Sequence, residues 1–177
     1  GSVQELRQEF GVGIVTSLVR IEGHPVGIIA NNNEHLGGAV DSPGADKLCR
    51  FAQLCDCFNI PILVLVDTTG MMVGPDVERT GLARKCNNIF VTLANVQTPR
   101  FTVILRKSYG LAAQAMMTGS SRAPLFALSW PTTEIGGMNL EAAVRLGERA
   151  ELAAIDDIDE RAARYEELVA HAYWKGK

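Results

Sequence analysis

Two runs of the sequence decide the fold: ILVLVDTTG at residues 62–70 and FTVILRKSYG at residues 101–110. Each begins with apolar, mostly β-branched residues in a nearly continuous row, the pattern of a strand buried on both faces. Each then passes through a glycine into a helical pattern. Because a helix joins the two runs, we predict that strands Ile62–Val66 and Phe101–Leu105 are adjacent and parallel.

Outward from these runs, the chain alternates strands and helices. Gly11–Arg20 and Pro25–Ala30 are predicted strands, joined by a tight hairpin turn at Glu22-Gly23-His24, and Leu125–Leu128 is a further candidate strand. Helical spacing runs from Leu82 to Leu93 and begins again at Asn139. The alternation predicts a single α/β domain whose mostly parallel sheet is covered by helices.

Two helix boundaries carry specific signals. Ser42 is the predicted N-cap of a helix with Pro43 at its first position, and Asn59-Ile60-Pro61 ends it. The last helix is predicted to begin in the acidic run Asp156–Glu160, which suits the positive end of a helix dipole. Its spacing predicts four buried side chains: Tyr165, Leu168, Val169 and Ala172.

The composition excludes several classes of partner. A chain of 177 residues that is 47% hydrophobic suits one compact domain, and its net charge of -3 offers no field for nucleic acid. No apolar run reaches the roughly 20 residues of a membrane span, and no secretory signal opens the chain. We expect no membrane partner and a cytoplasmic location, or the mitochondrial matrix in a eukaryote. Gly1-Ser2 is interpreted as a cloning remnant, and residues 3–177 as one domain of a longer subunit.

The cysteines do not predict a metal site. Cys49, Cys55, Cys57 and Cys86 lack the spacing of a structural zinc centre, and all lie in predicted helices. We expect reduced thiols that pack in the core. No bound metal is expected.

The loops after the two buried strands, residues 67–75 and 106–114, are the candidate site. In open α/β folds the ligand crevice lies beyond the carboxyl ends of the strands. Glycine allows a ligand to approach the backbone, and a helix start leaves several N–H groups unpaired. Two such sets of donors facing one point would form an oxyanion hole. Spacing alone favours a purely structural role, because any α/β protein has glycines after its strands.

The motifs, taken in order, resemble a known family from about Phe10 to the C-terminus. They are similar to those of the β subunits of biotin-dependent acyl-CoA carboxylases, such as propionyl-, acetyl- and methylcrotonyl-CoA carboxylases. The resemblance is to the C-terminal carboxyltransferase half and implies a crotonase-like fold. The matching segments are RIEGHPVGIIAN (20–31), DK and RF (46–51), CDCFNIP (55–61), DTTGMMVG (67–74), RKSYG (106–110) and WPTTE (130–134).

This resemblance implies an activity: transfer of a carboxyl group from carboxybiotin to the α-carbon of an acyl-CoA. It implies that the backbone amides of Leu111 and Ala112, after Gly110, act as oxyanion donors toward biotin. Gln114 occupies the position that helps to select the acyl group. The implied cofactor-binding residues are Gly70, Met71, Met72, Gly74 and Tyr109.

The implied partners are an N-terminal acyl-CoA-binding half, a biotin carboxyl carrier or biotin carboxylase subunit, acyl-CoA and further copies of the subunit. Without the other half, the isolated chain is expected to be inactive. The sequence departs from the family pattern at Thr69, where proline is usual, and at Leu111, where glycine is usual.

Other interpretations stay open. The chain could belong to a decarboxylase that runs the transfer towards biotin, or to an assembly domain without turnover. A crotonase-type hydratase is disfavoured because no paired glutamates follow the glycine loops. Met71 and Met72 suit a subunit contact as well as a cofactor wall, and Glu134 suits a structural role as well as a site-lining one. Asp67 is interpreted as orienting its own loop, and Arg106 and Lys107 as capping or ion-paired charges.

Overall fold

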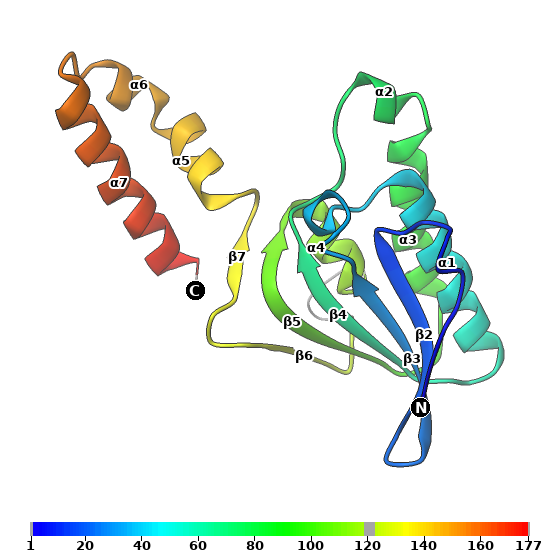
Figure 1. Ribbon diagram of the computed structural model, residues 1–177. Coiled ribbons are helices and arrows are strands. Elements are labelled where there is room, and N and C mark those ends of the chain that lie inside the picture. The colour runs from blue at the N-terminus through cyan, green and yellow to red at the C-terminus, as the bar shows by residue number, and fades with distance from the viewer. Residues whose placement is uncertain (1, 119–122, 177) are drawn as a thin grey trace.

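The computed structural model describes residues 2–118 and 123–176. Its centre is a seven-stranded sheet in the order β1-β2-β3-β4-β5-β6, with β7 paired to the end of β5 (Figure 1). The strands are β1 (Val3–Glu5), β2 (Ile14–Ile21), β3 (His24–Asn31), β4 (Ile62–Thr68), β5 (Arg100–Tyr109), β6 (Phe126–Ser129) and β7 (Glu134–Gly136).

The two deciding strands are neighbours. β4 and β5 pair in parallel, from Ile62 opposite Arg100 to Val66 opposite Ile104. β3 also pairs with β4 in parallel, as β6 and β7 each do with β5, whereas β1, β2 and β3 are antiparallel. The predicted adjacency and the mostly parallel sheet are confirmed.

The turn between β2 and β3 follows directly from the sequence. Glu22 and Gly23 both have positive φ angles, 49° and 86°, as a two-residue hairpin of the tightest kind requires. The predicted hairpin is confirmed. β1 and β7 were not predicted, because three residues are too few to show a period.

Helices α1 and α3 lie side by side on one face of the sheet with α4 beside them, and α5, α6 and α7 extend beyond β7 as an arm (Figure 1). The helices are η1 (Leu36–Gly38), α1 (Ser42–Cys57), α2 (Pro75–Glu78), α3 (Leu82–Asn95), α4 (Gly110–Met116), α5 (Leu140–Gly147), α6 (Arg149–Ala153) and α7 (Ile158–Lys175).

The core lies between the sheet and these first helices. Ile62, Val64 and Val66 on β4 are almost fully buried, whereas the alternating Leu63 and Leu65 are only partly covered. The expectation that β4 is buried on both faces is therefore corrected. Helices cover the Ile62 face, and the opposite face keeps partial contact with solvent.

The start of α1 differs from the prediction by one residue. Asp41, not Ser42, is the N-cap, and its carboxylate accepts a hydrogen bond of 2.8 Å from the amide of Gly44. Pro43 consequently occupies the second helical position. The Ser42 hydroxyl bonds the Thr80 hydroxyl instead, which ties α1 to the segment before α3.

Two burial predictions also need correction. The side chains of α7 expected to be buried are only partly covered, because α7 packs on the other helices of the arm. Among the cysteines, Cys57 is exposed, while Cys49, Cys55 and Cys86 are buried; all four are free thiols.

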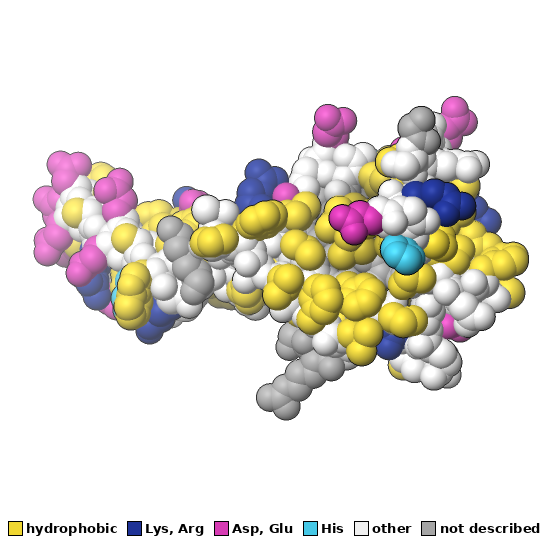
Figure 2. Space-filling model, turned by 90° about the horizontal axis from the view of Figure 1, so that it is seen from below, with side chains coloured by type: hydrophobic (Ala, Val, Ile, Leu, Met, Phe, Trp, Pro, Cys, Tyr) yellow, Lys and Arg dark blue, Asp and Glu magenta, His cyan; other side chains and the backbone are white. Residues whose placement is uncertain are grey.

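The surface of the arm differs from that of the core in charge. Acidic side chains gather at the end of the arm that lies farthest from the sheet (Figure 2).

Candidate active site

The two glycine loops begin side by side. After a register shift, Thr68 at the end of β4 pairs with Ser108 near the end of β5. The first loop therefore leaves the sheet beside the residue that lies two positions before Gly110. The beginnings of both loops meet at one edge of the sheet, as parallel strands require.

Asp67 fixes both loops at this edge. Its carboxylate accepts hydrogen bonds from Arg106 Nε at 3.1 Å and from the Lys107 amide at 3.0 Å, while its own amide donates to Asn31 Oδ1 at 3.1 Å. Gly38 passes so close that a Cβ there would lie 2.3 Å from the Asp67 carbonyl oxygen. The structure thus supports an orienting role for Asp67 and an ion-paired role for Arg106.

The second loop turns directly into α4. Gly110 has a φ of +61°, which favours glycine. A Cβ at this position would also lie 3.0 Å from the Gly137 carbonyl oxygen, so there is little space for a side chain. The amides of Leu111 and Ala112 belong to the first turn, where no intrahelical acceptor exists. Neither amide donates to the backbone outside the helix within the described residues.

The side chains at these two positions differ sharply. That of Leu111 is 62% exposed, whereas Ala112 is fully buried in the core. Leucine is tolerated where the family has glycine because its side chain points out of the packed interior. Ala112 can contribute to a site only through its N–H group.

Tyr109 supports the loop from beneath. It is fully buried, and its hydroxyl donates a hydrogen bond of 2.5 Å to Glu134 Oε2 on β7. Burial, together with this carboxylate, raises the pKa of Tyr109 above its ordinary value of 10.0. Glu134 thus has a structural contact, and any role of Tyr109 in ligand binding is indirect.

The first loop runs back towards the core. Met71 forms a bridge with Val40, and both Met71 and Met72 are partly buried against core side chains. Gly70 and Gly74 have positive φ angles with open space around them. Packing is thus the observed role of the two methionines.

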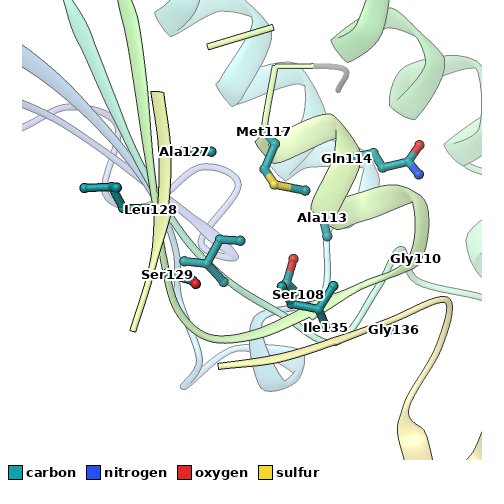
Figure 3. Close-up of a pocket in the computed structure, with 11 residues that line it drawn as sticks. Ser108, Gly110, Ala113, Gln114, Met117, Ala127, Leu128, Ser129, Ile135 and Gly136 are labelled. Atoms are coloured by element: carbon teal, nitrogen blue, oxygen red, sulfur yellow. The ribbon is translucent and has the colours of Figure 1, made fainter. Parts of the chain in front are cut away.

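A pocket of about 650 Å³ opens between α4 and strands β5, β6 and β7. It brings together Gly110 and Gln114 of the predicted site, but Leu111, Ala112 and the four predicted residues of the first loop do not line it. The Ser108 hydroxyl at its wall is buried and has no hydrogen-bond partner among the described residues. Figure 3 shows the Met117 side chain pointing from α4 into the space above Ser108, and Gln114 extending from α4 away from β6.

Sequence reasoning missed the walls that β6 and β7 supply. Ala127 and Ser129 come from β6, and Ile135 and Gly136 from β7. Their segment was recognised only as the motif WPTTE and a candidate strand. The WPTTE motif was the sequence signal for the part of the pocket wall that β7 supplies. It did not predict the pairing of β7 with β5, because that pairing depends on tertiary contacts.

In the part of the chain that the structure describes, no cluster of three or more His, Cys, Asp or Glu side chains could hold a metal ion. Among the same residues, no helix has the length and apolar character needed to cross a membrane.

The sheet, the paired glycine loops and the adjoining pocket define a crotonase-like α/β protein whose candidate donors are backbone amides. The carboxyl transferase domain family matches residues 1–174, and the chain belongs to this family.

Known relatives agree with this assignment. The chain is 36% identical over 177 residues to the biotin-dependent acetyl-/propionyl-coenzyme A carboxylase beta5 subunit of Mycobacterium tuberculosis, with 96% of this chain and 32% of that protein covered. The structure of a single-chain, multi-domain long-chain acyl-CoA carboxylase aligns with a TM-score of 0.88 and 52% identity, covering 100% of this chain and 17% of that one.

A crystal structure of the transcarboxylase 12S hexamer with methylmalonyl-coenzyme A aligns with a TM-score of 0.83 and 34% identity, covering 95% of this chain and 32% of that one. The chain spans about a third of the length of the curated relatives it matches.

Proposed function

We propose that this chain is the carboxybiotin-receiving half of an acyl-CoA carboxyltransferase, which passes a carboxyl group from carboxybiotin to the α-carbon of an acyl-CoA. The pairing of Thr68 with Ser108 carries the proposal, because it brings both glycine loops to one edge beside the start of α4. Membership of the carboxyl transferase domain family supports it. So does the relative that is named a biotin-dependent acetyl-/propionyl-coenzyme A carboxylase subunit.

The chemistry needs donors aimed at a developing oxyanion. Backbone N–H groups suit this task, because they are fixed before the reaction and need no reorganisation when charge develops. The amides of Leu111 and Ala112 would hold the ureido oxygen, with Gly70, Met71, Met72 and Gly74 on the facing loop. Asp67 keeps the loops in register through Arg106 and Lys107. Tyr109, held by Glu134, keeps Gly110 in position.

The residues present fit a neutral ureido group. Within residues 2–118 and 123–176, the amides of Leu111 and Ala112 have no backbone acceptor outside the helix, and no charged side chain lines the adjoining pocket. When bound, carboxybiotin would supply the carboxyl group that is transferred. The chain would work with an N-terminal acyl-CoA-binding half, with a biotin-carrying partner and with further copies of the subunit.

Replacing Leu111 with proline tests the amide assignment. Proline removes one N–H group but keeps a backbone angle suited to the first helical turn, where that N–H has no intrahelical acceptor. In the full-length protein with its biotin-carrying partner, we expect Leu111→Pro to lower kcat by about 10²- to 10³-fold, the usual loss for one oxyanion donor.

Leu111→Ala is the matched control, because it shortens the same exposed side chain and keeps the N–H group. Its carboxylation rate should stay within a few-fold of the wild-type rate. Thermal melting of both variants should match the wild type. Full activity in Leu111→Pro would show that this amide is not a donor.

A further inference from the structure

Lys47, on α1, is a buried basic side chain that the proposed transfer site does not use. It is 1% exposed, yet within residues 2–118 and 123–176 its ammonium group has no hydrogen bond or ion pair. Buried lysines are normally paired, because an ammonium group that leaves water without a partner is costly. The neighbouring Asp46 does not neutralise it, since that carboxylate accepts a hydrogen bond of 2.7 Å from Lys85 Nζ.

Lys47 lines a small pocket between α1 and the first two strands, which we call the Lys47 pocket. Its volume is about 110 Å³. The lining residues that α1 supplies follow each other at spacings of three, one and three positions, so they share one face of the helix. The lining consists of Leu6, Arg7, Thr16, Lys47, Arg50, Phe51 and Leu54.

The charges around the Lys47 pocket are mostly positive. Arg7 and Arg50 are exposed, and neither guanidinium group has a hydrogen bond or ion pair in the part of the chain that the structure describes. Burial lowers the pKa of Lys47, the nearby Glu5 carboxylate raises it, and Arg7 lowers it further. With Glu5 counted against the three cations, two positive charges remain in excess. The Thr16 hydroxyl adds no donor, because it bonds the Leu6 carbonyl oxygen at 2.9 Å.

This pocket is separate from the transfer site. Its walls, α1 and β2, lie on the side of the sheet away from the arm (Figure 1). β2 is three strand positions from β5, which corresponds to roughly 14 Å across the sheet. Lys47, Arg50 and Phe51 nevertheless belong to a segment, residues 46–51, that matches the family motif and has no part in the proposed transfer.

We propose that Lys47, Arg50 and Arg7 form a binding site for a phosphate group, either free phosphate or the terminal group of a phosphate ester. With on the order of 30 Å³ for each water-sized heavy atom, the pocket holds roughly four atoms, so a phosphate group fills it with one oxygen at the mouth. Guanidinium groups bind phosphate oxygens in pairs, and an ammonium group adds a compact charge. A phosphate ester carries between about 1.5 and 2 negative charges at neutral pH, which matches the excess of positive charge.

Calorimetric titration of the full-length protein with inorganic phosphate, in a phosphate-free buffer near neutral pH, tests the site. Lys47→Met removes the ammonium group and keeps an unbranched side chain. It should weaken phosphate binding by about 10- to 100-fold, the usual loss for a hydrogen bond to a charged group. Without phosphate, this variant should melt no earlier than the wild type, because an apolar side chain replaces an unpaired buried charge.

Arg84→Met is the matched control, because it removes one positive charge at an exposed position of α3 outside the Lys47 pocket. Its affinity for phosphate should equal that of the wild type. Arg50→Gln changes an exposed side chain of the pocket, so it should weaken binding severalfold without changing the melting temperature.

A parallel titration with phenyl phosphate separates the two sources of the phosphate group. Tighter binding of the ester than of inorganic phosphate would identify the terminal group of a larger ligand, and binding of inorganic phosphate alone would identify the free ion. Either result supports the site if Lys47→Met abolishes it. Absence of binding at millimolar phosphate, or equal affinities in the wild type, Lys47→Met and Arg50→Gln, would overturn the site and leave the proposed carboxyltransferase function standing.

Discussion

Helices α1 and α7 have similar lengths, sixteen and eighteen residues, but very different surroundings. Nine residues of α1 are buried, while none in α7 is. α1 packs on both the sheet and α3, whereas α7 packs mainly on α5 and α6. Both helices show an apolar stripe in the sequence, so the stripe does not tell how deeply a helix is buried. The number of layers around the helix decides that.

The arm is joined to the core at a narrow junction beside the candidate site. β7 pairs with the end of β5, and the Ile135 amide donates to the Gly176 carbonyl oxygen at the end of α7. Within the arm, Arg164 pairs with Glu151 and Glu167 at partly exposed positions. The core is therefore stabilised mainly by apolar burial, and the arm by local polar pairs and half-buried contacts.

The largest expected difference between the two regions is the cost of a cavity. Ile62→Ala, at a fully buried position of β4, should lower the free energy of unfolding by about 3 kcal/mol or more. Leu168→Ala, at a half-buried position of α7, should cost about 1 kcal/mol or less, because less apolar surface returns to water. Urea unfolding of both variants measures the difference. Equal costs would show that the arm is packed as tightly as the core.

Ion pairs should show the same contrast on a smaller scale. Asp67→Asn leaves Arg106 without its carboxylate at a nearly buried position, and we expect a loss of about 2 kcal/mol. Glu151→Gln, which breaks a partly exposed pair in the arm, should cost well under about 1 kcal/mol. Denaturant midpoints separate the two cases. A larger cost in the arm than at Asp67 would refute the proposed orienting role of this residue.

Tyr109→Phe probes the junction itself. Loss of the hydroxyl leaves Glu134 without its donor, and we expect a cost of about 1 kcal/mol below pH 10, with faster amide exchange in β7 than in β4. Because the pKa of Tyr109 is raised in the folded protein, the unfolded chain loses this proton first as the pH rises. The contribution of Tyr109 is therefore full below its ordinary pKa of 10.0 and is lost as the pH rises through the folded value.

Stability curves against pH check this last expectation. Wild-type stability should fall more steeply above pH 10 than that of Tyr109→Phe. Tyr165→Phe, which removes an exposed hydroxyl bonded to Arg145 in the arm, is the control and should follow the wild-type curve. Parallel curves for the wild type and Tyr109→Phe would contradict the raised pKa.

The positions of the two glycine loops were predictable because their signals are local. The glycines at 70 and 110 follow apolar runs directly, and the amides of Leu111 and Ala112 lie in the first turn of a helix, as the resemblance implies. The pocket was not predictable in the same way. Ala127 and Ile135 line the pocket only because β6 pairs with the first half of β5 and β7 with its last residues.

The sequence by itself determined the elements whose signals lie within a few residues: strands β4 and β5, the hairpin at Glu22 and Gly23, and the start of α5 at Asn139. These follow from backbone sterics, side-chain period and capping, which act over short stretches of chain. Only the tertiary structure decided that Asp41 caps α1, that Tyr109 reaches Glu134, and that α7 remains half-exposed. Burial and long-range pairing depend on which other layers are present, and no local pattern records that.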